Sequence, residues 1–370
     1  MRLGKTISSL VQARRNVSGQ ESESRLSEIP ALHANPGNLR GFFYMPEGLT
    51  GAVPLVVVLH GCTQNAAGYD QGSGWSRLAD RHGFAVLFPE QQRANNQNLC
   101  FNWFSPEDTQ RGLGEAASIR SMVEALSKAH PIDPARIFVT GLSAGGAMTC
   151  VMLATYPELF AGGAVIAGIP YGCASNLHQA FECMAGRLPI EGAELAASVR
   201  RASSHQGPWP RVSVWHGSED GMVAPSNGQA IIRQWAELHG VAREPSRSEL
   251  VGGYPRRVWI GPQGEAAIEE YVITGMAHGT PLMPGTDEGQ SGEAMAHMLD
   301  VGLSSTDRIA SFFGIAPEPA EHGRRFSKGI KAAKPRPRAR PAIRLPEAEA
   351  APGSVQKVIE DALRTAGLMH

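Results

Sequence analysis

Apolar runs and amphipathic stretches alternate along most of this chain. Short runs rich in β-branched and aromatic residues, bounded by glycine, proline or polar residues, predict buried strands. These runs cover residues 39–44, 54–60, 84–88, 136–140, 160–167, 211–216, 256–260 and 267–273. Between them, apolar residues recur at helical spacing. The helices predicted from this spacing cover residues 75–82, 114–130, about 144–156, 194–202, 225–239 and 305–313.

The order of these elements predicts the fold class. Strands that alternate with helices form a mostly parallel sheet with helices on both faces, because each parallel connection must cross over the sheet. The run PLVVVLH at 54–60 is apolar at every position except its last, as in a strand that is buried on both faces. We therefore predict an α/β protein.

Composition and charge narrow the range of functions. The chain has 370 residues, of which 42% are hydrophobic, and its 42 glycines indicate many tight turns, which suits an enzyme with catalytic loops. The formal net charge of −1 gives no sign of a nucleic-acid or membrane-surface partner. No apolar run approaches the roughly 20 residues that a membrane span needs. The first twenty residues contain no apolar core like that of a secretory signal, so the sequence predicts a cytoplasmic protein.

The strongest chemical signal is GLSAG at 141–145, followed by another glycine. It lies between a predicted strand and a predicted helix, which is the context of a nucleophile elbow. In such a turn the serine hydroxyl points away from the sheet, and the residues two before and two after it must be small. We therefore predict that Ser143 is a nucleophile.

A serine hydroxyl is a weak nucleophile near neutral pH and needs a base that is oriented by an acid. In this type of fold the chain order is serine, acid, histidine. Asp220 follows a predicted strand in a glycine-flanked loop, with Glu219 as its rival. His278 lies in a glycine-bounded loop after the strand at 267–273. We predict that Asp220 orients His278, which takes the proton of the serine.

Three other histidines are less well placed for catalysis. His60 and His216 each end a predicted strand, where a histidine more often caps the strand or lines a site. His297 falls in a stretch that we predict to be helical. We therefore assign none of them to the triad.

An oxyanion hole needs two backbone N–H donors. Ala144, directly after the nucleophile, is the first candidate. His60-Gly61 resembles the start of a lipase-type HG motif, which makes the N–H of Cys62 the second candidate. The alternative interpretation of this dipeptide is a tight turn.

Five cysteines are present, and their spacing fits no zinc site, so we predict no metal. Cys150 lies in an apolar run and is predicted to be buried. The other four lie in loop-like stretches that are compatible with two disulfides, Cys62–Cys100 and Cys173–Cys183. Free thiols in a reducing compartment are the alternative.

Longer stretches resemble one family of enzymes. The polyhydroxybutyrate depolymerase family of esterases is similar to this chain in the segments LHGCTQNAAGYDQGSGWSRLADRHGFAVLFPEQ, CFNWF and GLSAGGAMTCVMLATYPELFAGGAVIAGIPYG. Acetylxylan and feruloyl esterases are near relatives of that family. The resemblance covers about residues 35–315.

The resemblance implies an α/β-hydrolase fold, no cofactor, and a serine esterase that acts on 3-hydroxyalkanoate esters, polymeric or oligomeric. Matched residue by residue, it places the nucleophile on Ser143, the acid on Asp220, the base on His278 and an oxyanion donor on Cys62. Secreted members carry a signal peptide and often a polymer-binding domain. This chain shows neither, although the resemblance also admits an extracellular location.

Changes in composition divide the chain into four parts. Residues 1–35 form an N-terminal extension, and residues 36–315 form the α/β-hydrolase catalytic domain. Residues 316–352 are basic and rich in proline, which predicts a disordered linker. Residues 353–370 return to helical spacing and predict an amphipathic helix. This C-terminal tail either docks on the catalytic domain or contacts a partner or a polymer granule.

Four residues are candidates for substrate contact because they lie in or next to loops at the predicted carboxyl edge of the sheet, where ligands bind in such folds. They are Trp75, Asn102, Trp103 and Trp215. Aromatic side chains suit an aliphatic ester chain. The alternative is that each residue anchors the core or a loop.

Two other functions are compatible with this sequence. A carbohydrate esterase that removes acetyl or feruloyl groups would use the same catalytic groups. A granule-associated interaction protein with an inactive hydrolase body is the alternative that is not an enzyme. The complete set of triad residues argues against the latter.

Overall fold

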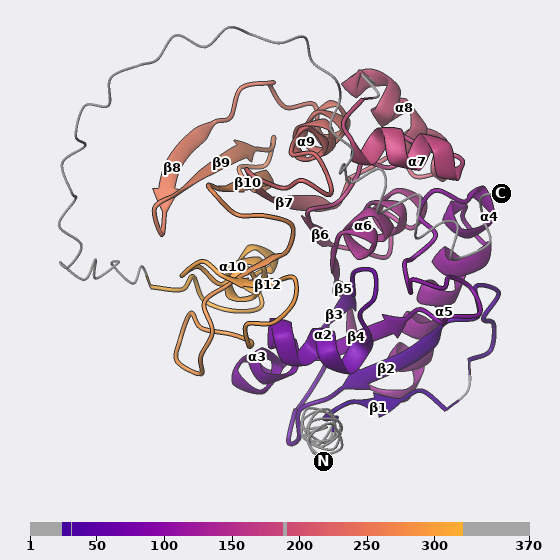
Figure 1. Cartoon of the computed structure of the whole chain (residues 1–370). Helices are drawn as coiled ribbons and strands as arrows, with labels where there is room; N and C mark the ends of the chain where they lie inside the picture. Colours follow the sequence, from indigo (N-terminus) through magenta and orange to yellow (C-terminus); the bar gives the residue numbers. More distant parts are fainter. Residues whose placement is uncertain (1–23, 31, 188–190, 321–370) are drawn as a thin grey trace, which may run out of the picture. The chain divides into compact units, whose positions relative to one another are not determined.

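A computed structural model describes residues 24–320 of this chain, except 31 and 188–190 (Figure 1). Within these residues the sheet strands are β1 (Ser27–Glu28), β2 (Arg40–Tyr44), β3 (Val53–Leu59), β4 (Ala85–Glu90), β5 (Ile132–Leu142), β6 (Gly162–Ile166), β7 (Arg211–Gly217), β8 (Arg247–Val251), β9 (Tyr254–Ile260) and β10 (Ala266–Ile273). They form one sheet in the order β1-β2-β4-β3-β5-β6-β7-β10-β9-β8. A separate pair consists of β11 (Thr280–Leu282) and β12 (Met298–Asp300).

The middle of the large sheet is parallel. From β4 to β10 in the sheet order, each strand pairs in parallel with the next. The antiparallel strands lie at the two edges, β1 and β2 at one and β9 and β8 at the other. The carboxyl ends of β3, β5, β7 and β10 therefore meet at one edge of the sheet. The predicted chemical motifs follow these four strands.

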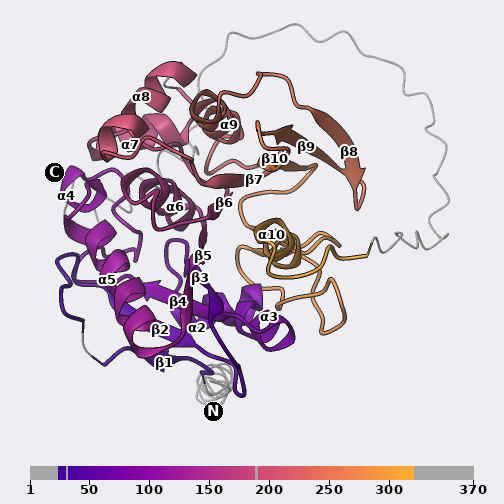
Figure 2. The same cartoon turned by 180° about the vertical axis from the view of Figure 1, so that it is seen from behind.

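Helices cover both faces of the sheet (Figures 1 and 2). They are α2 (Ala66–Ser73), α3 (Trp75–His82), α4 (Pro106–Thr109), α5 (Gly114–Ala129), α6 (Ala144–Thr155), α7 (Leu177–Met184), α8 (Gly192–Ala202), α9 (Ser226–His239) and α10 (Ser305–Phe313). The core on one face includes α5, α6, α8 and α9, and the core on the other includes α2, α3 and α10. The α/β architecture predicted from the sequence is confirmed.

The strand β3 shows why its sequence is apolar without alternation. Leu55, Val57 and Leu59 belong to one buried cluster, and Val56 and Val58 belong to the cluster on the opposite face. Successive side chains of a strand point to opposite faces, and both faces of this sheet are covered by helices. Every position of the strand is therefore buried.

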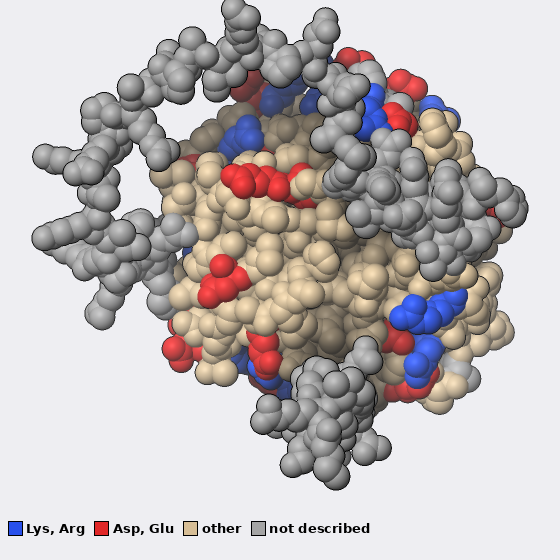
Figure 3. All heavy atoms as spheres, viewed as in Figure 1, with Lys and Arg blue, Asp and Glu red and all other residues tan. Residues whose placement is uncertain are grey.

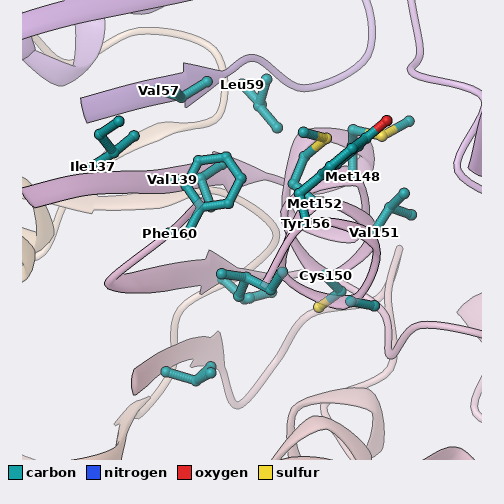
Figure 4. Close-up of a cluster of buried hydrophobic side chains, with 14 of the residues drawn as sticks. Val57, Leu59, Ile137, Val139, Met148, Cys150, Val151, Met152, Tyr156 and Phe160 are labelled. Atoms are coloured by element: carbon teal, nitrogen blue, oxygen red, sulfur yellow. The ribbon is translucent and has the colours of Figure 1, made fainter. Parts of the chain in front are cut away.

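The helix α6 is the most deeply buried of the described helices, with all of its 12 residues buried. Figure 4 shows Met148 and Met152 of α6 in the same cluster as Leu59 of β3 and Val139 of β5. Dense packing on all sides restricts the movement of a helix. The residue that precedes α6 is therefore held by a rigid frame.

Some elements were not predicted from the sequence. The helix α2 was not predicted because one of its buried residues is Asp70, which breaks the apolar pattern. Its carboxylate accepts hydrogen bonds from the N–H and hydroxyl of Ser76. The strand β8 was not predicted because four of its five residues are exposed, so it has no apolar run. The predicted helix at 353–370, and the predicted linker beyond residue 320, lie outside the described residues.

The strand β1 pairs with β2, so residues 27–28 of the predicted N-terminal extension join the sheet. No helix of the described part combines the length and the apolar character needed to cross a membrane. On the face shown in Figure 3, acidic and basic side chains lie mostly towards the rim, and the centre is largely uncharged. The charge on this face is mixed rather than of one sign.

Candidate active site

Ser143 lies in the turn between β5 and α6, as the sequence predicts. Its backbone has φ 57° and ψ −117°, which is strained for a residue other than glycine and is typical of a nucleophile elbow. The N–H of Ser143 donates to the carbonyl of Ile166 at 2.9 Å, and its own carbonyl accepts from the N–H of Ala147 at 2.9 Å. These bonds help to hold the strained turn in place.

Close backbone contacts explain why small residues surround Ser143. A Cβ atom on Gly141 would collide with the carbonyl oxygen of Gly145. A Cβ atom on Gly145 would meet the carbonyl oxygens of Leu59 and His60, the latter at 2.6 Å. Only glycine fits at these two positions. The elbow therefore packs directly on the end of β3, where the predicted oxyanion loop begins.

Asp220 and His278 form a buried pair, with exposed fractions of 5% and 8%. The Nδ1–H of His278 donates to Oδ2 of Asp220 at 2.7 Å. This bond fixes the tautomer of the neutral ring and leaves Nε2 free to accept a proton. The other carboxylate oxygen, Oδ1, accepts from the N–H groups of Met222 and Val223, each at 2.9 Å. The acid is therefore anchored by its own loop.

These contacts keep the carboxylate of Asp220 ionised. Burial alone would raise the pKa of Asp220, but the close approach of His216 and the hydrogen bond from His278 outweigh burial and hold the pKa well below its usual range. The rival acid, Glu219, is exposed. The geometry therefore supports Asp220 as the partner of His278.

Ser143, Asp220 and His278 follow β5, β7 and β10, whose carboxyl ends lie at the same edge of the sheet. The hydrogen bonds of the described residues include none between Ser143 Oγ and His278 Nε2. In serine hydrolases this contact is often loose before substrate binds. The acid–base half of the predicted triad thus has its working geometry, and the assignment of the whole triad is a proposal.

His216 contacts the acid directly, although its sequence position indicated only a cap or lining residue. Its Nε2–H donates to the carbonyl of Val223 at 2.9 Å, and the same nitrogen lies 3.3 Å from Oδ2 of Asp220. The spacing HGSED, with the histidine four residues before the aspartate, is the signal that could have identified it. Asp220 therefore has a histidine on each side.

His297 lies against His278 rather than in the helix that we predicted. It occupies a turn just before β12, with φ 60°. Its Nδ1–H donates to the carbonyl of His278 at 3.2 Å, and the two rings meet edge to face with their centroids 5.8 Å apart. His297 therefore supports the loop that carries the base.

The two predicted oxyanion donors are Cys62 and Ala144. Among the described residues, neither backbone N–H has a hydrogen-bond partner. Ala144 is the first residue of α6, where an α-helix leaves the N–H unpaired and has the positive end of its dipole. A Cβ atom on Gly61 would lie 3.4 Å from Cδ2 of Leu142, so the loop that carries Cys62 lies beside the elbow. This arrangement can hold a developing oxyanion.

The structure contains one of the two proposed disulfides. Cys62 and Cys100 are bonded, which ties the oxyanion loop to the loop that follows β4. The second proposed disulfide is wrong for this structure, because Cys173 and Cys183 are both free. The thiol of Cys183 points at the carbonyl of Cys173 and donates to it at 3.0 Å. Cys150 is free and buried, as predicted.

Removing the disulfide is expected to destabilise the protein. The bond joins residues 38 positions apart, and chain entropy predicts that a loop of about this length contributes roughly 3–4 kcal/mol to the free energy of unfolding. The double variant Cys62→Ser, Cys100→Ser should therefore unfold at lower denaturant concentration than wild type. A reducing agent should shift wild type in the same direction and leave the double variant unchanged. An equal shift in both proteins would contradict this assignment.

Two of the proposed substrate contacts are wrong. Trp75 begins α3 and is buried against Phe84, with ring centroids 6.2 Å apart. Trp215 is fully buried in β7, stacks on Tyr271 of β10 at 3.8 Å, and donates its Nε1–H to the hydroxyl of Ser213. Neither side chain can reach a ligand, because both lie in the buried cluster between the sheet and the helices on one of its faces. Both residues belong to the core.

Asn102 and Trp103 lie in the loop after β4, two and three residues after Cys100. The backbone N–H and side-chain amide of Asn102 both donate to Glu115, and its side-chain oxygen accepts from Asn96. We therefore assign Asn102 to holding the loop rather than to substrate. Trp103 is partly buried and packs against a cluster that includes Ala147 of α6. It stays a candidate for substrate contact.

No set of three or more histidine, cysteine or acidic side chains within residues 24–320 is arranged to hold a metal ion.

Comparison with known proteins identifies the family. The model of the family described as Esterase PHB depolymerase matches residues 40–248, which is more than half of the chain. This chain belongs to that family. It is therefore an esterase, which confirms the family resemblance seen in the sequence.

Individual relatives agree with this result. The chain is 48% identical over 293 residues to Poly(3-hydroxyalkanoate) depolymerase C of Paucimonas lemoignei, which covers 78% of this chain and 70% of that protein. It is 32% identical over 264 residues to an acetylxylan esterase of Coprinopsis cinerea, with 70% of each chain covered. Acetyl xylan esterase from Aspergillus awamori has a similar structure, with a TM-score of 0.66 and 27% identity over 79% of this chain and 99% of that chain. The α/β-hydrolase fold is thus confirmed.

Proposed function

We propose that this protein is a serine esterase that hydrolyses 3-hydroxyalkanoate ester bonds, such as those of poly- or oligo-3-hydroxybutyrate. One observation carries the proposal. The buried Asp220–His278 pair lies at the same sheet edge as the strained Ser143, in a chain 48% identical to a poly(3-hydroxyalkanoate) depolymerase.

The chemistry follows from the geometry of these groups. The hydroxyl of Ser143 attacks the ester carbonyl while Nε2 of His278 takes its proton. Asp220 stabilises the resulting imidazolium through the 2.7 Å bond to Nδ1. The carbonyl oxygen becomes negative and accepts from the N–H groups of Cys62 and Ala144. His278 then gives the proton to the leaving 3-hydroxyl group.

A second half-reaction restores the enzyme. Water attacks the acyl group on Ser143 while His278 again takes a proton, and the same two N–H groups hold the second oxyanion. The free carboxylic acid leaves and Ser143 regains its proton. The whole cycle needs no group beyond those described above and water.

A second candidate function is deacetylation of a carbohydrate. The observation that favours it is the similarity in sequence and structure to acetylxylan esterases. Both reactions use the same attack on an ester carbonyl. They differ in whether the sugar or the hydroxyacid is recognised.

Parallel kinetics separate the two candidates. We expect a higher kcat/KM for 3-hydroxybutyrate oligomers than for acetylated xylan, with amorphous polyhydroxybutyrate as a third substrate. A preference for acetylated xylan would overturn the first candidate in favour of the second. Equal inactivity on all three would support an inactive hydrolase body.

The proposed contact of the C-terminal tail with a polymer granule concerns a segment outside the described residues. Binding to native granules and kcat/KM on soluble oligomers, measured for the full chain and for a chain that lacks residues 317–370, test it. Weaker binding to native granules, with unchanged kcat/KM on soluble oligomers, is the expected result. Unchanged granule binding would remove the tail from this role.

A further inference from the structure

Four polar residues, His60, Gln91, Asn102 and Glu115, are linked by side-chain and backbone hydrogen bonds behind the oxyanion loop. His60, Gln91 and Glu115 are almost fully buried, with exposed fractions of 1%, 2% and 0%. Gln91 Nε2 donates to Oε1 of Glu115 at 2.6 Å and to the carbonyl of Cys100 at 3.0 Å. Asn102 donates to both oxygens of Glu115, each at 2.8 Å. None of these contacts has a role in the mechanism described above.

The hydrogen bonds of His60 fix its tautomer. The backbone N–H of Gln91 donates to Nε2 of His60 at 3.1 Å. A backbone N–H can only donate, so Nε2 carries no proton and Nδ1 carries it. The Nδ1–H then donates to the carbonyl oxygen of Gly61 at 2.8 Å. Burial lowers the pKa of His60 to about 4, so the ring stays neutral at neutral pH.

The carbonyl of Gly61 belongs to the same peptide unit as the N–H of Cys62. This peptide is trans, and the C=O and N–H of a planar trans peptide point in opposite directions. A bond that fixes the oxygen on one side therefore fixes the direction of the N–H on the other. Glycine leaves the backbone on that side free to rotate, so the orientation must come from such a contact.

The same group of side chains holds the loop at a second point. Cys62 is bonded to Cys100, and the carbonyl of Cys100 accepts from the side chain of Gln91. The N–H of Thr63 donates to the carbonyl of Asn98 at 2.7 Å. The oxyanion loop is therefore restrained from both sides. On the donor peptide itself, the Gly61 carbonyl accepts from Nδ1–H of His60 at 2.8 Å and from the N–H of Gln64 at 3.3 Å, so the shorter contact is that of His60.

We propose that His60 is a positioning residue for ester hydrolysis, which directs the N–H of Cys62 at the oxyanion through its bond to the Gly61 carbonyl. This inference rests on the proposed function, because it takes that N–H as an oxyanion donor. A donor that is already oriented needs no rearrangement when negative charge develops on the substrate oxygen. His60 itself faces the interior, with its ring 5.0 Å from that of Phe101.

Three substitutions of His60 separate its two hydrogen bonds. In His60→Asn the side-chain amide can take the place of Nδ1–H, which keeps the bond to Gly61 and loses the acceptor for Gln91. In His60→Gln the side-chain oxygen reaches the place of Nε2, which keeps the acceptor for Gln91 and loses the bond to Gly61. His60→Phe loses both bonds and keeps a ring against Phe101.

We expect these variants to differ in kcat rather than in KM on p-nitrophenyl butyrate. His60→Asn should keep kcat within about 5-fold of wild type, whereas His60→Gln and His60→Phe should each lose roughly 10–100-fold, with KM within about 2-fold. A purely structural role predicts instead that activity follows thermal stability in all three. A folded His60→Gln with wild-type kcat, or a folded His60→Asn as slow as His60→Phe, would overturn the proposal.

Two measurements on wild type keep this test separate from the proposed function. Hydrolysis of p-nitrophenyl butyrate and labelling of Ser143 by a fluorophosphonate show whether the protein is a serine esterase at all. Long-range ¹H–¹⁵N spectra of the imidazoles report the tautomer of His60 without any use of activity. A proton on Nδ1 is the expected result, and a proton on Nε2 would overturn the inference even in an active enzyme.

Discussion

Replacement of Ser143 with alanine is expected to lower kcat on p-nitrophenyl butyrate by about 10⁵–10⁶-fold. The reason is that the variant lacks the hydroxyl proposed to form the acyl intermediate, while the N–H groups of Cys62 and Ala144 and the binding surface remain. A residual rate of roughly 10³–10⁴-fold above that of water should therefore persist. Fluorophosphonate labelling should disappear together with turnover.

A matched control is available in Ser248→Ala, which removes an exposed hydroxyl on the edge strand β8, far along the sheet order from β5. This variant should keep wild-type kcat and wild-type labelling. Retention of activity in Ser143→Ala, with the control also active, would show that the nucleophile lies elsewhere. Circular dichroism of both variants checks that each is folded.

The variant Asp220→Asn should lower kcat by about 10⁴-fold at neutral pH. The carboxylate accepts from two backbone N–H groups at Oδ1 and from the Nδ1–H of His278 at Oδ2. An asparagine that turns its oxygen to the backbone must present its NH₂ group to His278. His278 then carries its proton on Nε2 and cannot accept the proton of Ser143.

Glu219→Gln is the matched control, because it makes the same chemical change in the neighbouring, exposed acid. It should keep kcat within about 2-fold of wild type, in the range of an exposed substitution. A large loss in Glu219→Gln with little loss in Asp220→Asn would exchange the roles of the two acids. A pH profile of each variant, measured on the same ester, shows whether the base has changed its protonation.

The candidate nucleophile, Ser143, could be predicted because the elbow is a local structure. The strand, the turn, the small residues and the helix follow one another directly in the chain. The steric limit also acts locally, because a Cβ atom on Gly141 would collide with Gly145, only four positions away. The candidate acid and base were predicted from chain order and from glycine-flanked loops. Their 2.7 Å contact joins residues 58 positions apart and is visible only in the folded chain.

The proposed substrate contacts show where local prediction fails. Trp215 lies one residue before the end of a predicted strand and was therefore predicted to lie near the ligand edge, but it stacks on Tyr271 of the neighbouring strand. In a strand that is buried on both faces, every position is apolar. The sequence pattern therefore does not show which side chains pack under helices and which reach a ligand. The same limitation hid the contact between His216 and Asp220.

The α/β class, the family, the nucleophile turn and the order of the candidate triad could all be predicted from the residues alone. These features depend on backbone sterics and on periodic apolar patterns, which act over a few residues. The pairing of the cysteines, the burial of the tryptophans and the contacts of the histidines around the site became known only from the folded chain. Each of these depends on the direction of a polar or aromatic side chain toward a partner that is distant in the chain, as in the 31-residue separation of His60 and Gln91. That direction is set by packing of the whole sheet and its helices.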